Sequence, residues 1–534
     1  MDEFDVVVLG AGAAGLTAAL AAADAGASVG LFEKSSLVGG TTCLSSGVAW
    51  LPDNRYAREA GVADSRAEGI RYLRSLSRDM IRPGMAEAFV DGTAEVTEWL
   101  ERRTPLHLSL VPGYPDYHPE HPGGKPQGGR SVEPHLFGFD ALGAWADRLE
   151  GRPRRMMVRE TPVGGGTGVV APDEADRREA QRLEGLGRAM IGALLKGCLD
   201  RGTEPVTDAA AVELVQDGDR VRGVRFADGS AVSARRGVVL ATGGFEWDPG
   251  LVRDFLRGPM SYPATVPTNT GDGLRMAMKA GARLGNMREA WWVPVCVLPG
   301  QSNHGEQAVH LVLRERTLPG SIMVNRDGVR FTNEAANYNA LGGAFHQLDP
   351  GSFDYVNDRC WLVFDARHVE EYGGFTLPPG QAPEWAQRGD SVGELARAID
   401  VEPATLEAEV TRFNAMAKAG DDEDFGRGRS AYDGFVGDKR HYPGAASTLG
   451  PLERGPYYAV RLHLSTLGTK GGPQTDVDGS VFTVDGDPIP GLYAAGNAMA
   501  GPTGMVYGGA GGTLGPALVF GYRAGRAAAS GGRR

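Results

Sequence analysis

Two short apolar runs and an alanine-rich segment between them open the chain. Residues 4–9 (FDVVVL) predict a buried strand, and residues 28–32 (SVGLF) predict a second one. The segment from Leu16 to Ala25 is rich in alanine and leucine, which predicts a helix that ends at Gly26. Strand, helix and strand in this order form a βαβ unit, so a parallel sheet is expected at the start of the chain.

Farther along, the pattern alternates between helical and strand-like stretches. Apolar spacing from Leu183 to Leu195 predicts one long helix over residues 173–202. Proline, glycine, histidine and tyrosine crowd residues 105–135, which predicts an irregular loop. The other predicted elements are helices over 66–104, 391–399 and 403–418 and from about Pro516 onward, strands over 210–216, 220–226, 236–242, 321–325 and 360–365, and a last strand with a glycine-rich loop over 488–497.

The sequence changes character near residue 284 and returns to its first character near residue 448. Irregular loops, strands and two helices occupy the middle, whereas both ends carry buried strands followed by glycine-rich turns. The predicted fold class is therefore α/β. A Rossmann-like domain would be built from both chain ends (residues 1–283 and 448–534), with an inserted α+β catalytic domain at 284–447.

Composition narrows the class of partner. The 534-residue chain carries a net charge of −12, so nucleic acid is not expected as a partner. The four cysteines form no CxxC pair, which argues against a metal site and favours a reducing compartment. No apolar stretch reaches the roughly 20 residues that a membrane helix needs. We expect a cytoplasmic protein, and peripheral association with a membrane stays open.

A GxGxxG motif lies between the first predicted strand and helix. Gly10 supplies the tight turn, Gly12 leaves room for a pyrophosphate, and Gly15 allows close packing of helix and strand. The helix N-terminus then faces the phosphates with free N–H groups. Glu33 follows 18 residues after Gly15, where an acid can accept hydrogen bonds from ribose hydroxyls. The motif predicts a dinucleotide but does not separate FAD from NAD.

Downstream small-residue segments favour the larger cofactor, FAD. Loops at 39–42 and 45–47 can follow a ribityl chain and the edge of a flavin, and further turns follow the strands near 241, 271 and 496. The last helix is preceded by a glycine loop, so its N-terminus can face the flavin's pyrimidine oxygens. Besides Gly10, Gly12, Gly15 and Glu33, the predicted cofactor-binding residues are Ala14, Lys34, Gly39, Gly40, Thr41, Thr42, Ser45, Ser46, Gly47, Ala211, Val212, Ala241, Thr242, Gly243, Gly271, Asp272, Gly496, Asn497, Gly512, Thr513 and Leu514.

Four longer motifs carry a family resemblance. They are YPDYHPEHPGG (114–124), LPGSIMVNRDGVRFTNEAANY (318–338), LGTKGG (467–472) and GLYAAGN followed by VYGGAGGTLGPALVFGYRAG (506–525). With them the chain resembles the fumarate reductase/succinate dehydrogenase class of flavoproteins, and within it the 3-ketosteroid 1-dehydrogenases. The resemblance covers nearly the whole chain. It implies an FAD enzyme that introduces a double bond next to a ring ketone.

The departures from the wider class are informative. No arginine lies between Gly501 and Tyr522, where dicarboxylate-binding relatives carry one, so a dicarboxylate would lack a bidentate partner there. No histidine lies between Glu33 and Trp50, so the FAD is expected to be non-covalent. After the loop tyrosine, this chain has Gly-Gly-Ala-Gly where the steroid enzymes often have prolines.

The resemblance implies four catalytic positions. Tyr507 and the backbone N–H of Gly511 would hold the ketone oxygen, which is the oxyanion type of stabilisation. Tyr338 matches the group that removes the alpha proton, and Tyr117 matches the tyrosine that supports it. Because an unperturbed phenol titrates near pH 10, a tyrosine base needs a hydrogen-bond relay or a positive field.

The substrate side of the site is less defined by sequence. An apolar pocket suits a flat ring ketone, but the same aromatic and aliphatic side chains can equally form ordinary core of the inserted domain. The residues in question are Tyr114, Trp291, Trp292, Leu311, Leu313 and Phe345, of which Tyr114, Trp292 and Leu313 are the predicted substrate-binding residues alongside Tyr507 and Gly511.

Three alternatives stay open for the reaction. The first is 1,2-desaturation of a 3-ketosteroid with a quinone-type external electron acceptor. The second is the same chemistry on a smaller ring, cyclohexanone or an oxocyclohexane carboxylate. A carboxylate would call for a pocket cation, for which Arg314 and Arg316 are candidates, although solvated surface is their expected role. The third is a fumarate-reductase-like alkene reductase.

Overall fold

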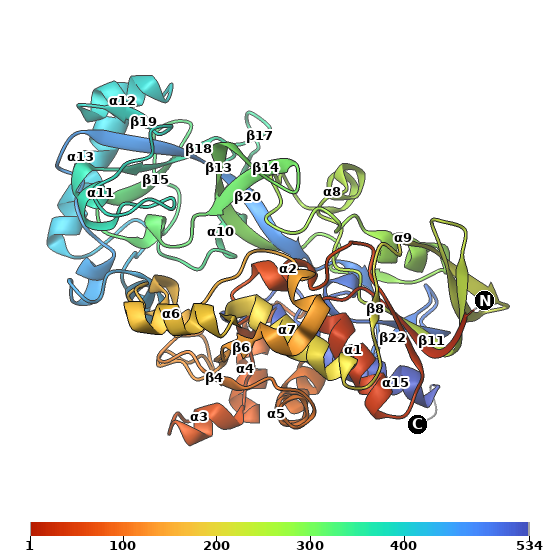
Figure 1. The fold of residues 1–534 in the computed structure, drawn as a ribbon. Helices are drawn as coiled ribbons and strands as arrows, with labels where there is room; N and C mark the ends of the chain where they lie inside the picture. Colours follow the sequence, from red (N-terminus) through yellow and green to blue (C-terminus); the bar gives the residue numbers. More distant parts are fainter. Residues whose placement is uncertain (1, 532–534) are drawn as a thin grey trace.

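The structure is a computed structural model that describes residues 2–531. Its larger sheet takes strands from both ends of the chain. β1 (Asp2–Leu9) lies at the centre, parallel to β2 (Val29–Phe32) on one side and to β11 (Ala231–Leu240) on the other. β23 (Pro488–Ala494) pairs in parallel with β11. The order is β22-β23-β11-β1-β2-β8, with β10 and β9 extending from β11 as an antiparallel meander (Figure 1). The added strands are β22 (Ser480–Phe482), β8 (Pro205–Val206), β10 (Arg220–Phe226) and β9 (Ala211–Asp217). The predicted Rossmann-like sheet is confirmed.

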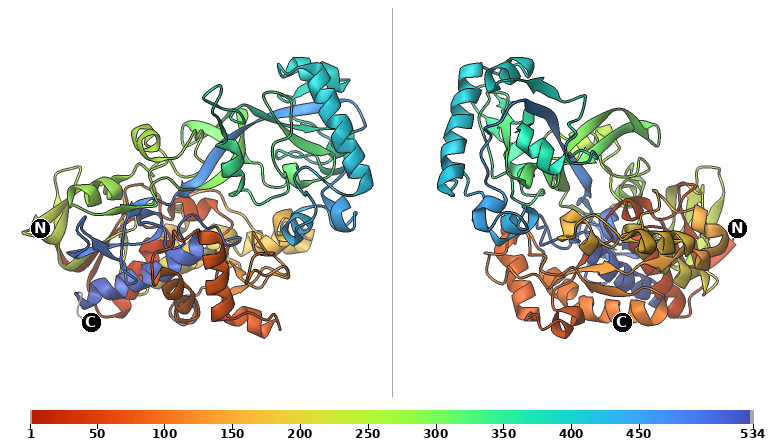
Figure 2. Two further views of the ribbon diagram at one scale, coloured as in Figure 1. Left: turned by 180° about the vertical axis from the view of Figure 1, so that it is seen from behind. Right: turned by 60° about the vertical axis from the view of Figure 1, so that its left-hand side comes forward.

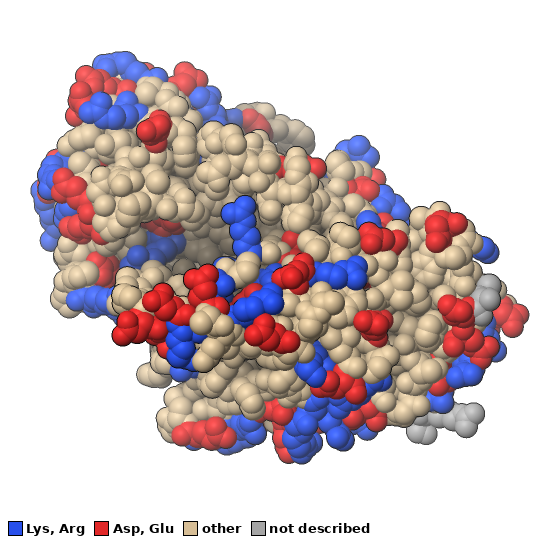
Figure 3. Space-filling model, viewed as in Figure 1, with Lys and Arg blue, Asp and Glu red and all other residues tan. Residues whose placement is uncertain are grey.

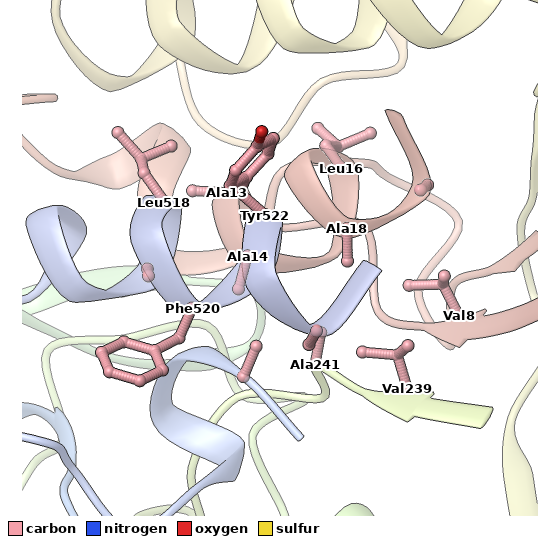
Figure 4. Packing of buried hydrophobic residues seen from close by; sticks show 14 of the residues in the cluster. Val8, Ala13, Ala14, Leu16, Ala18, Val239, Ala241, Leu518, Phe520 and Tyr522 are labelled. Atoms are coloured by element: carbon pink, nitrogen blue, oxygen red, sulfur yellow. The ribbon is translucent and has the colours of Figure 1, made fainter. Parts of the chain in front are cut away.

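The first and last long helices pack against each other beside this sheet. α1 (Ala13–Asp24) and α15 (Leu514–Ser530) lie side by side, with apolar side chains from both and from β1 and β11 filling the space between helices and sheet (Figure 4). A Cβ on Gly525 would lie 2.2 Å from the carbonyl oxygen of Ala18, so this close approach requires glycine. The contact ties the C-terminal helix to the N-terminal dinucleotide motif.

A second sheet forms the other half of the molecule. Its order is β14 (Glu306–Leu311), β13 (Ala290–Asn303), β20 (Tyr457–Thr469), β18 (Cys360–Phe364) and β15 (Ser321–Asn325), and every neighbouring pair is antiparallel. In Figures 1 and 2 both chain ends lie in the first half, and the second half extends away from them. The antiparallel sheet accounts for the strands predicted at 321–325 and 360–365.

The middle strand of this second sheet lies beyond the predicted domain boundary. β20 comes from the segment assigned by sequence to the dinucleotide domain, which was expected to resume at residue 448. Its alternating side chains suit either sheet, and only its pairing with β13 and β18 decides between them. The predicted helices of the inserted part are present as α12 (Val392–Ala398) and α13 (Pro403–Ala419).

Two predicted helices are each broken into two. The single helix expected over 173–202 is wrong: α6 (Pro172–Ala180) ends early, and α7 (Leu186–Leu199) begins after a turn. A Cβ on Gly185, just before α7, would lie 1.9 Å from the carbonyl oxygen of Met156, so a distant chain segment fixes the break. Apolar spacing that continues across a turn imitates one helix.

The helix expected over 66–104 is likewise two helices. α4 (Arg66–Ser77) and α5 (Met85–Arg103) are separated by a turn in which Gly84 has a φ of 79°. α4 ends at its cap residue Arg78, which has a φ of 49°, and Gly84 then precedes the first residue of α5.

The proline- and tyrosine-rich loop at 105–135 is tied down at both ends. β4 (Leu108–Leu110) and β5 (Ser131–Pro134) pair with each other, and β5 also pairs with β3 (Ala49–Trp50). Inside the loop, Asp116 accepts hydrogen bonds from Trp50 Nε1 at 2.7 Å and from Arg130 Nη1 at 2.8 Å. The loop is therefore anchored to the segment that follows the dinucleotide motif.

Short elements complete the architecture. No helix within residues 2–531 is long and apolar enough to span a membrane. The remaining elements are helices α2 (Gly40–Leu44), α3 (Arg55–Glu59), α8 (Pro249–Phe255), α9 (Asp272–Lys279), α10 (Leu341–Phe345), α11 (Ala366–Tyr372) and α14 (Ala431–Val436); strands β6 (Phe137–Gly138), β7 (Leu183–Glu184), β12 (Leu284–Gly285), β16 (Leu348–Asp349), β17 (Asp354–Tyr355), β19 (Gln387–Gly389) and β21 (Gly472–Pro473); and short 3-10 turns.

Candidate active site

A cavity of about 440 Å³ runs between the two halves of the molecule. One end is lined by the glycine turn after β1 and by the loops that follow β2, β11 and β23, whereas the other is lined by tyrosines and aliphatic side chains. Figure 3 shows the hollow between the halves, with Lys and Arg side chains at its edge. The carboxyl ends of the parallel strands open into it, as expected for a ligand site in an open α/β sheet.

The glycine turn after β1 is shaped for a ligand that approaches the backbone. Gly10 has a φ of 101°, and a Cβ there would lie 2.3 Å from the carbonyl oxygen of Ala241. A Cβ on Gly15 would lie 1.8 Å from the carbonyl oxygen of Gly10. These contacts hold β1, α1 and β11 so close that the N-terminus of α1 opens directly into the cavity. The N–H groups of the small residues Gly12 and Ala14, which line the cavity, fit a pyrophosphate.

Glu33 and Lys34 form the next part of this wall. Glu33 accepts hydrogen bonds from the backbone N–H of Ala11 at 2.8 Å and of Ser35 at 2.9 Å. Burial raises the pKa of its carboxyl despite these donors. Lys34 Nζ lies 2.7 Å from Asp272 Oδ2, which joins the β2 loop to the start of α9. Glu33 therefore braces the glycine turn and still faces the cavity, where ribose hydroxyls would lie.

Most predicted cofactor residues line the cavity. Five of the predicted glycines instead shape its wall from behind, because a Cβ at each would collide with neighbouring atoms. The lining residues are Gly10, Gly12, Ala14, Glu33, Lys34, Gly40, Thr41, Thr42, Ser45, Ser46, Ala211, Ala241, Thr242, Gly243, Asp272, Gly496, Asn497, Thr513 and Leu514, and the supporting glycines are Gly15, Gly39, Gly47, Gly271 and Gly512.

Val212 is a correction to the predicted set. Its neighbour Ala211 lines the cavity, but side chains alternate along β9, and Val212 is 45% exposed. Sequence reasoning also missed Asn269, which lines the cavity and donates to Thr41 Oγ1 at 3.2 Å and to Glu246 Oε1 at 2.7 Å. No local motif marks Asn269, because its partners lie on separate loops.

Three tyrosine hydroxyls meet at the other end of the cavity. Tyr117 Oη donates to Tyr338 Oη at 2.7 Å, and Tyr338 Oη donates to Tyr507 Oη at 3.0 Å. The three residues come from the 105–135 loop, the segment after β15 and the loop before α15. Burial raises the pKa of all three phenols, that of Tyr117 and Tyr338 to well above the ordinary value. The predicted cluster is therefore brought together as a chain of neutral phenols.

Gly511 faces the same space as Tyr507. It has a φ of 92°, its carbonyl accepts from Trp50 N at 2.9 Å, and a Cβ there would lie 2.4 Å from the carbonyl oxygen of Val48. The preceding glycines pack on the Trp50 indole: a Cβ on Gly509 would lie 2.5 Å from its Cδ1. The Gly-Gly-Ala-Gly sequence is thus explained by the close indole.

A buried arginine holds the backbone of the segment that leads to Tyr338. Arg316 is 0% exposed, and its guanidinium donates to the carbonyl oxygens of Val312, Glu334 and Ala336. The expectation that Arg316 lies on the surface is wrong, because its Nε and Nη1 donate to three carbonyl oxygens inside the protein. Neither Arg316 nor Arg314 lines the cavity.

A buried ion cluster also supports the segment that leads to Tyr338. Arg330 pairs with Glu334 and with Asp422, and all three side chains are fully buried. Arg427 also contacts Glu334. The cluster joins the turn after β15 to the segment after α13.

The predicted substrate-wall residues divide between the cavity and the core of the second sheet. Tyr114, Leu311 and Leu313 line the cavity. Trp292 does not: it is 0% exposed, and its ring meets His346 at 4.8 Å between centroids, within the core of the second sheet. Trp291 faces the opposite way, with its ring 4.7 Å from that of Tyr507. Alternation along a strand separates the two tryptophans, so the assignment of Trp292 to the substrate pocket is wrong.

One cation that sequence reasoning did not single out lies on the cavity wall. Arg154 donates through Nη2 to the carbonyl oxygens of Leu44 at 2.9 Å and Ser45 at 2.7 Å. Its other recorded bond, to the carbonyl of Cys43, also uses Nη2, so Nε and Nη1 stay available to a ligand. Its position depends on the loop before α6, which carries no recognisable motif.

Comparison with known proteins places this geometry in a family. The FAD binding domain family model matches residues 5–514. The chain is 40% identical to 4-oxocyclohexanecarboxylate 2-dehydrogenase of Sinomonas cyclohexanicum, over 98% of this chain and 92% of that protein. It is 38% identical to 3-oxosteroid 1-dehydrogenase of Mycobacterium tuberculosis, over 98% of both chains.

A solved structure agrees over the whole length. The crystal structure of 3-ketosteroid delta1-dehydrogenase from Sterolibacterium denitrificans in complex with 1,4-androstadiene-3,17-dione superposes with a TM-score of 0.89 at 33% identity, covering 99% of this chain and 100% of that one. The chain therefore binds FAD, is an oxidoreductase, and belongs to the 3-ketosteroid 1-dehydrogenase family of FAD-dependent flavoproteins.

Proposed function

We propose that the protein introduces a carbon–carbon double bond next to a ring ketone, and that 1,2-desaturation of a 3-ketosteroid is its principal reaction. The observation that carries the proposal is the hydrogen-bonded chain of Tyr117, Tyr338 and Tyr507, with Gly511 facing the same space. A carbon next to the alpha carbon of a ketone loses hydride only when the alpha proton leaves and the carbonyl oxygen is stabilised. The cluster offers a group for each task.

The hydrogen-bond pattern supports a division of roles within this proposal. Tyr507 accepts from Tyr338, which leaves its own proton free to donate to the ketone oxygen, and the N–H of Gly511 is the second donor. Together they stabilise negative charge on that oxygen as the alpha proton leaves. Bound FAD supplies the acceptor for the hydride from the beta carbon.

Proton removal falls to Tyr338. Its Oη takes the alpha proton when it is ionised, and the hydrogen bond from Tyr117 Oη stabilises the phenolate. Because burial raises the pKa of Tyr338 well above its ordinary value, only a small fraction is ionised at neutral pH. The contribution of Tyr338 as the base should therefore grow as pH rises.

The walls of the cavity support a largely apolar ring substrate. Aliphatic side chains surround the tyrosines on both sides. Steroid recognition is also in the names of two relatives that match almost the whole chain. The aliphatic lining residues are Val48, Val158, Val163, Leu186, Leu311, Leu313 and Leu467.

A smaller oxocyclohexane carboxylate is the second candidate. Arg154 is the observation that favours it, because a guanidinium with free donors can bind a carboxylate. The 40% identical relative is named for a substrate of this kind. The two candidates share the ketone chemistry and differ at the far end of the ring.

Three further features belong to the proposal. The cavity wall within residues 2–531 contains neither histidine nor cysteine, which supports non-covalent FAD. All four cysteines are buried free thiols, which supports a reducing, cytoplasmic setting. An external acceptor of the quinone type would reoxidise the flavin.

Anaerobic flavin bleaching tests the reaction and the substrate. The purified holoenzyme is mixed with a 3-ketosteroid, 4-oxocyclohexanecarboxylate or cyclohexanone, and loss of the oxidised flavin absorbance is followed. Fastest bleaching by the steroid supports the principal proposal. Fastest bleaching by the carboxylate, slowed in Arg154→Gln but not in the exposed Arg152→Gln control, supports the second. No bleaching by any of the three contradicts both.

A further inference from the structure

Lys470 lies buried directly behind the ketone-binding tyrosine. It follows the end of β20 in the LGTKGG motif and is 1% exposed. Its Nζ donates to the carbonyl oxygens of Met505 at 2.8 Å and Val506 at 3.2 Å. Those two residues immediately precede Tyr507, so the ammonium group fixes the chain where it enters the active site.

The same ammonium group is stacked against the aromatic side of the cluster. Nζ lies 3.9 Å from the Trp291 ring centroid and 5.9 Å from that of Tyr507. Trp291 meets the Tyr507 ring edge-on at 4.7 Å and donates through Nε1 to Asn497 Oδ1 at 3.0 Å. Because Asn497 lines the main cavity, Lys470 sits one layer behind the wall and out of the substrate's reach.

This position is costly for a lysine. No carboxylate within residues 2–531 lies at ion-pair distance from Nζ, and the partners are carbonyl oxygens and ring faces. Burial of an ammonium without a counter-ion is unfavourable, so an apolar or amide side chain would serve a purely structural role at lower cost. A charge retained in this place points to an electrostatic task.

We propose that Lys470 is a positioning residue that fixes the segment before Tyr507 and holds a positive charge behind its ring, so that the Tyr507 hydroxyl becomes a stronger donor to the ketone oxygen. This inference rests on the proposed function of Tyr507. A positive charge in a water-excluded site stabilises developing negative charge without reorganising.

Neighbouring charges set when this effect operates. Burial lowers the pKa of Lys470 to about 7; Glu289 opposes this shift and Arg257 adds to it. Those two residues pair with each other at 3.1 Å. The assistance to Tyr507 is therefore present below about pH 7 and is lost as pH rises.

Binding of 4-nitrophenol, an oxyanion mimic, tests the charge without any turnover. At about pH 6 most free 4-nitrophenol is neutral, so phenolate in the difference spectrum of the bound ligand reports anion stabilisation by the site. We expect clear phenolate in the wild type, about tenfold less in Lys470→Met and Lys470→Gln, and recovery in Lys470→Arg. Lys439→Met is the matched control, because Lys439 Nζ also lies 3.9 Å over an aromatic ring, that of Phe435, whereas the rings under Lys470 are those of Trp291 and Tyr507.

The outcomes separate the two proposals. Bound phenolate that is equal in the wild type and in FAD-containing Lys470→Met overturns the role of Lys470. No flavin bleaching of the wild type by any ring ketone overturns the proposed function instead. If Lys470→Met does not fold, Lys470→Gln decides. Steady-state kinetics of the Lys470 variants give a further measurement. Loss of the charge should lower kcat, whereas a change of shape alone should raise KM.

Discussion

The two ends of the cavity are built on different principles. The dinucleotide end consists of backbone and small side chains, and a single Cβ at Gly10 or Gly15 would collide with main-chain atoms. The ketone end consists of large side chains from three distant segments, joined through hydroxyl groups. The dinucleotide end therefore requires that side-chain atoms be absent, whereas the ketone end requires hydroxyl groups that are present and aligned.

This difference decides what each kind of substitution does. Added side-chain atoms at the dinucleotide end should abolish FAD binding completely, without intermediate affinities. Removed atoms at the ketone end should leave the fold and the cofactor intact and change the rate alone. Three of the following predictions separate the two effects, and one tests the buried ion cluster of Arg330, Glu334 and Asp422; the largest effect comes first.

Gly15→Val should abolish FAD binding. A Cβ at this position would lie 1.8 Å from the carbonyl oxygen of Gly10, so β1 and α1 would have to separate. Flavin absorbance per protein, measured after gel filtration, checks this. Gly343→Ala in α10 is the control, because nothing lies within 4 Å of a Cβ there. Full flavin content in Gly15→Val would refute the contrast.

Tyr507→Phe should retain FAD but reduce flavin about 10² to 10³ times more slowly, because one donor to the ketone oxygen is lost. Stopped-flow bleaching with the best ring ketone measures the rate. Tyr262→Phe is the control, since Tyr262 is exposed. An unchanged rate would remove Tyr507 from the proposed mechanism.

Asp422→Asn should destabilise the protein by about 3 kcal/mol, because it leaves Arg330 with one buried carboxylate fewer. Burial opposes ionisation of Asp422, but the hydrogen bonds and charge of Arg330 hold its pKa below the ordinary value. Its contribution to stability is thus present above about pH 4 and is lost at more acidic pH. Urea unfolding at neutral and acidic pH checks both points, and a wild-type midpoint at neutral pH would contradict them.

Tyr117→Phe should slow flavin reduction by about tenfold, the smallest of the four effects, because it removes a stabilising hydrogen bond and not the base itself. The rate should still rise with pH, with the rise displaced to higher pH. A pH profile of stopped-flow bleaching measures this displacement. A rise at the same pH as in the wild type would argue that Tyr117 only packs against Tyr338.

The same contrast explains how far the sequence could be interpreted. The βαβ unit and most of the cofactor wall follow from neighbours in sequence, since Gly10, Gly12 and Gly15 act within one turn. The tyrosine cluster was predicted only through motifs shared with a family, because no local pattern brings Tyr117, Tyr338 and Tyr507 together.

The errors share a cause, which is that distant contacts override local patterns. From the sequence alone Arg316 is expected at the surface, but in the fold it is buried and donates to three carbonyl oxygens. Trp291 and Trp292 are adjacent in sequence, and only the register of β13 decides which of them faces the tyrosines. The break before α7 depends on Met156. β20 joins the second sheet between β13 and β18, both more than 90 residues away in the chain.

The β13–β14 hairpin offers a practical route to altered enzymes. Leu311 ends β14 and Leu313 follows it, and both line the substrate end, whereas every residue of the cofactor wall lies on other segments. Libraries confined to residues 304–313 would vary the shape of the ring pocket while leaving the flavin cradle untouched. Biocatalysts for differently sized ketones could then be selected from one scaffold, by exchanging a short, partly exposed ribbon.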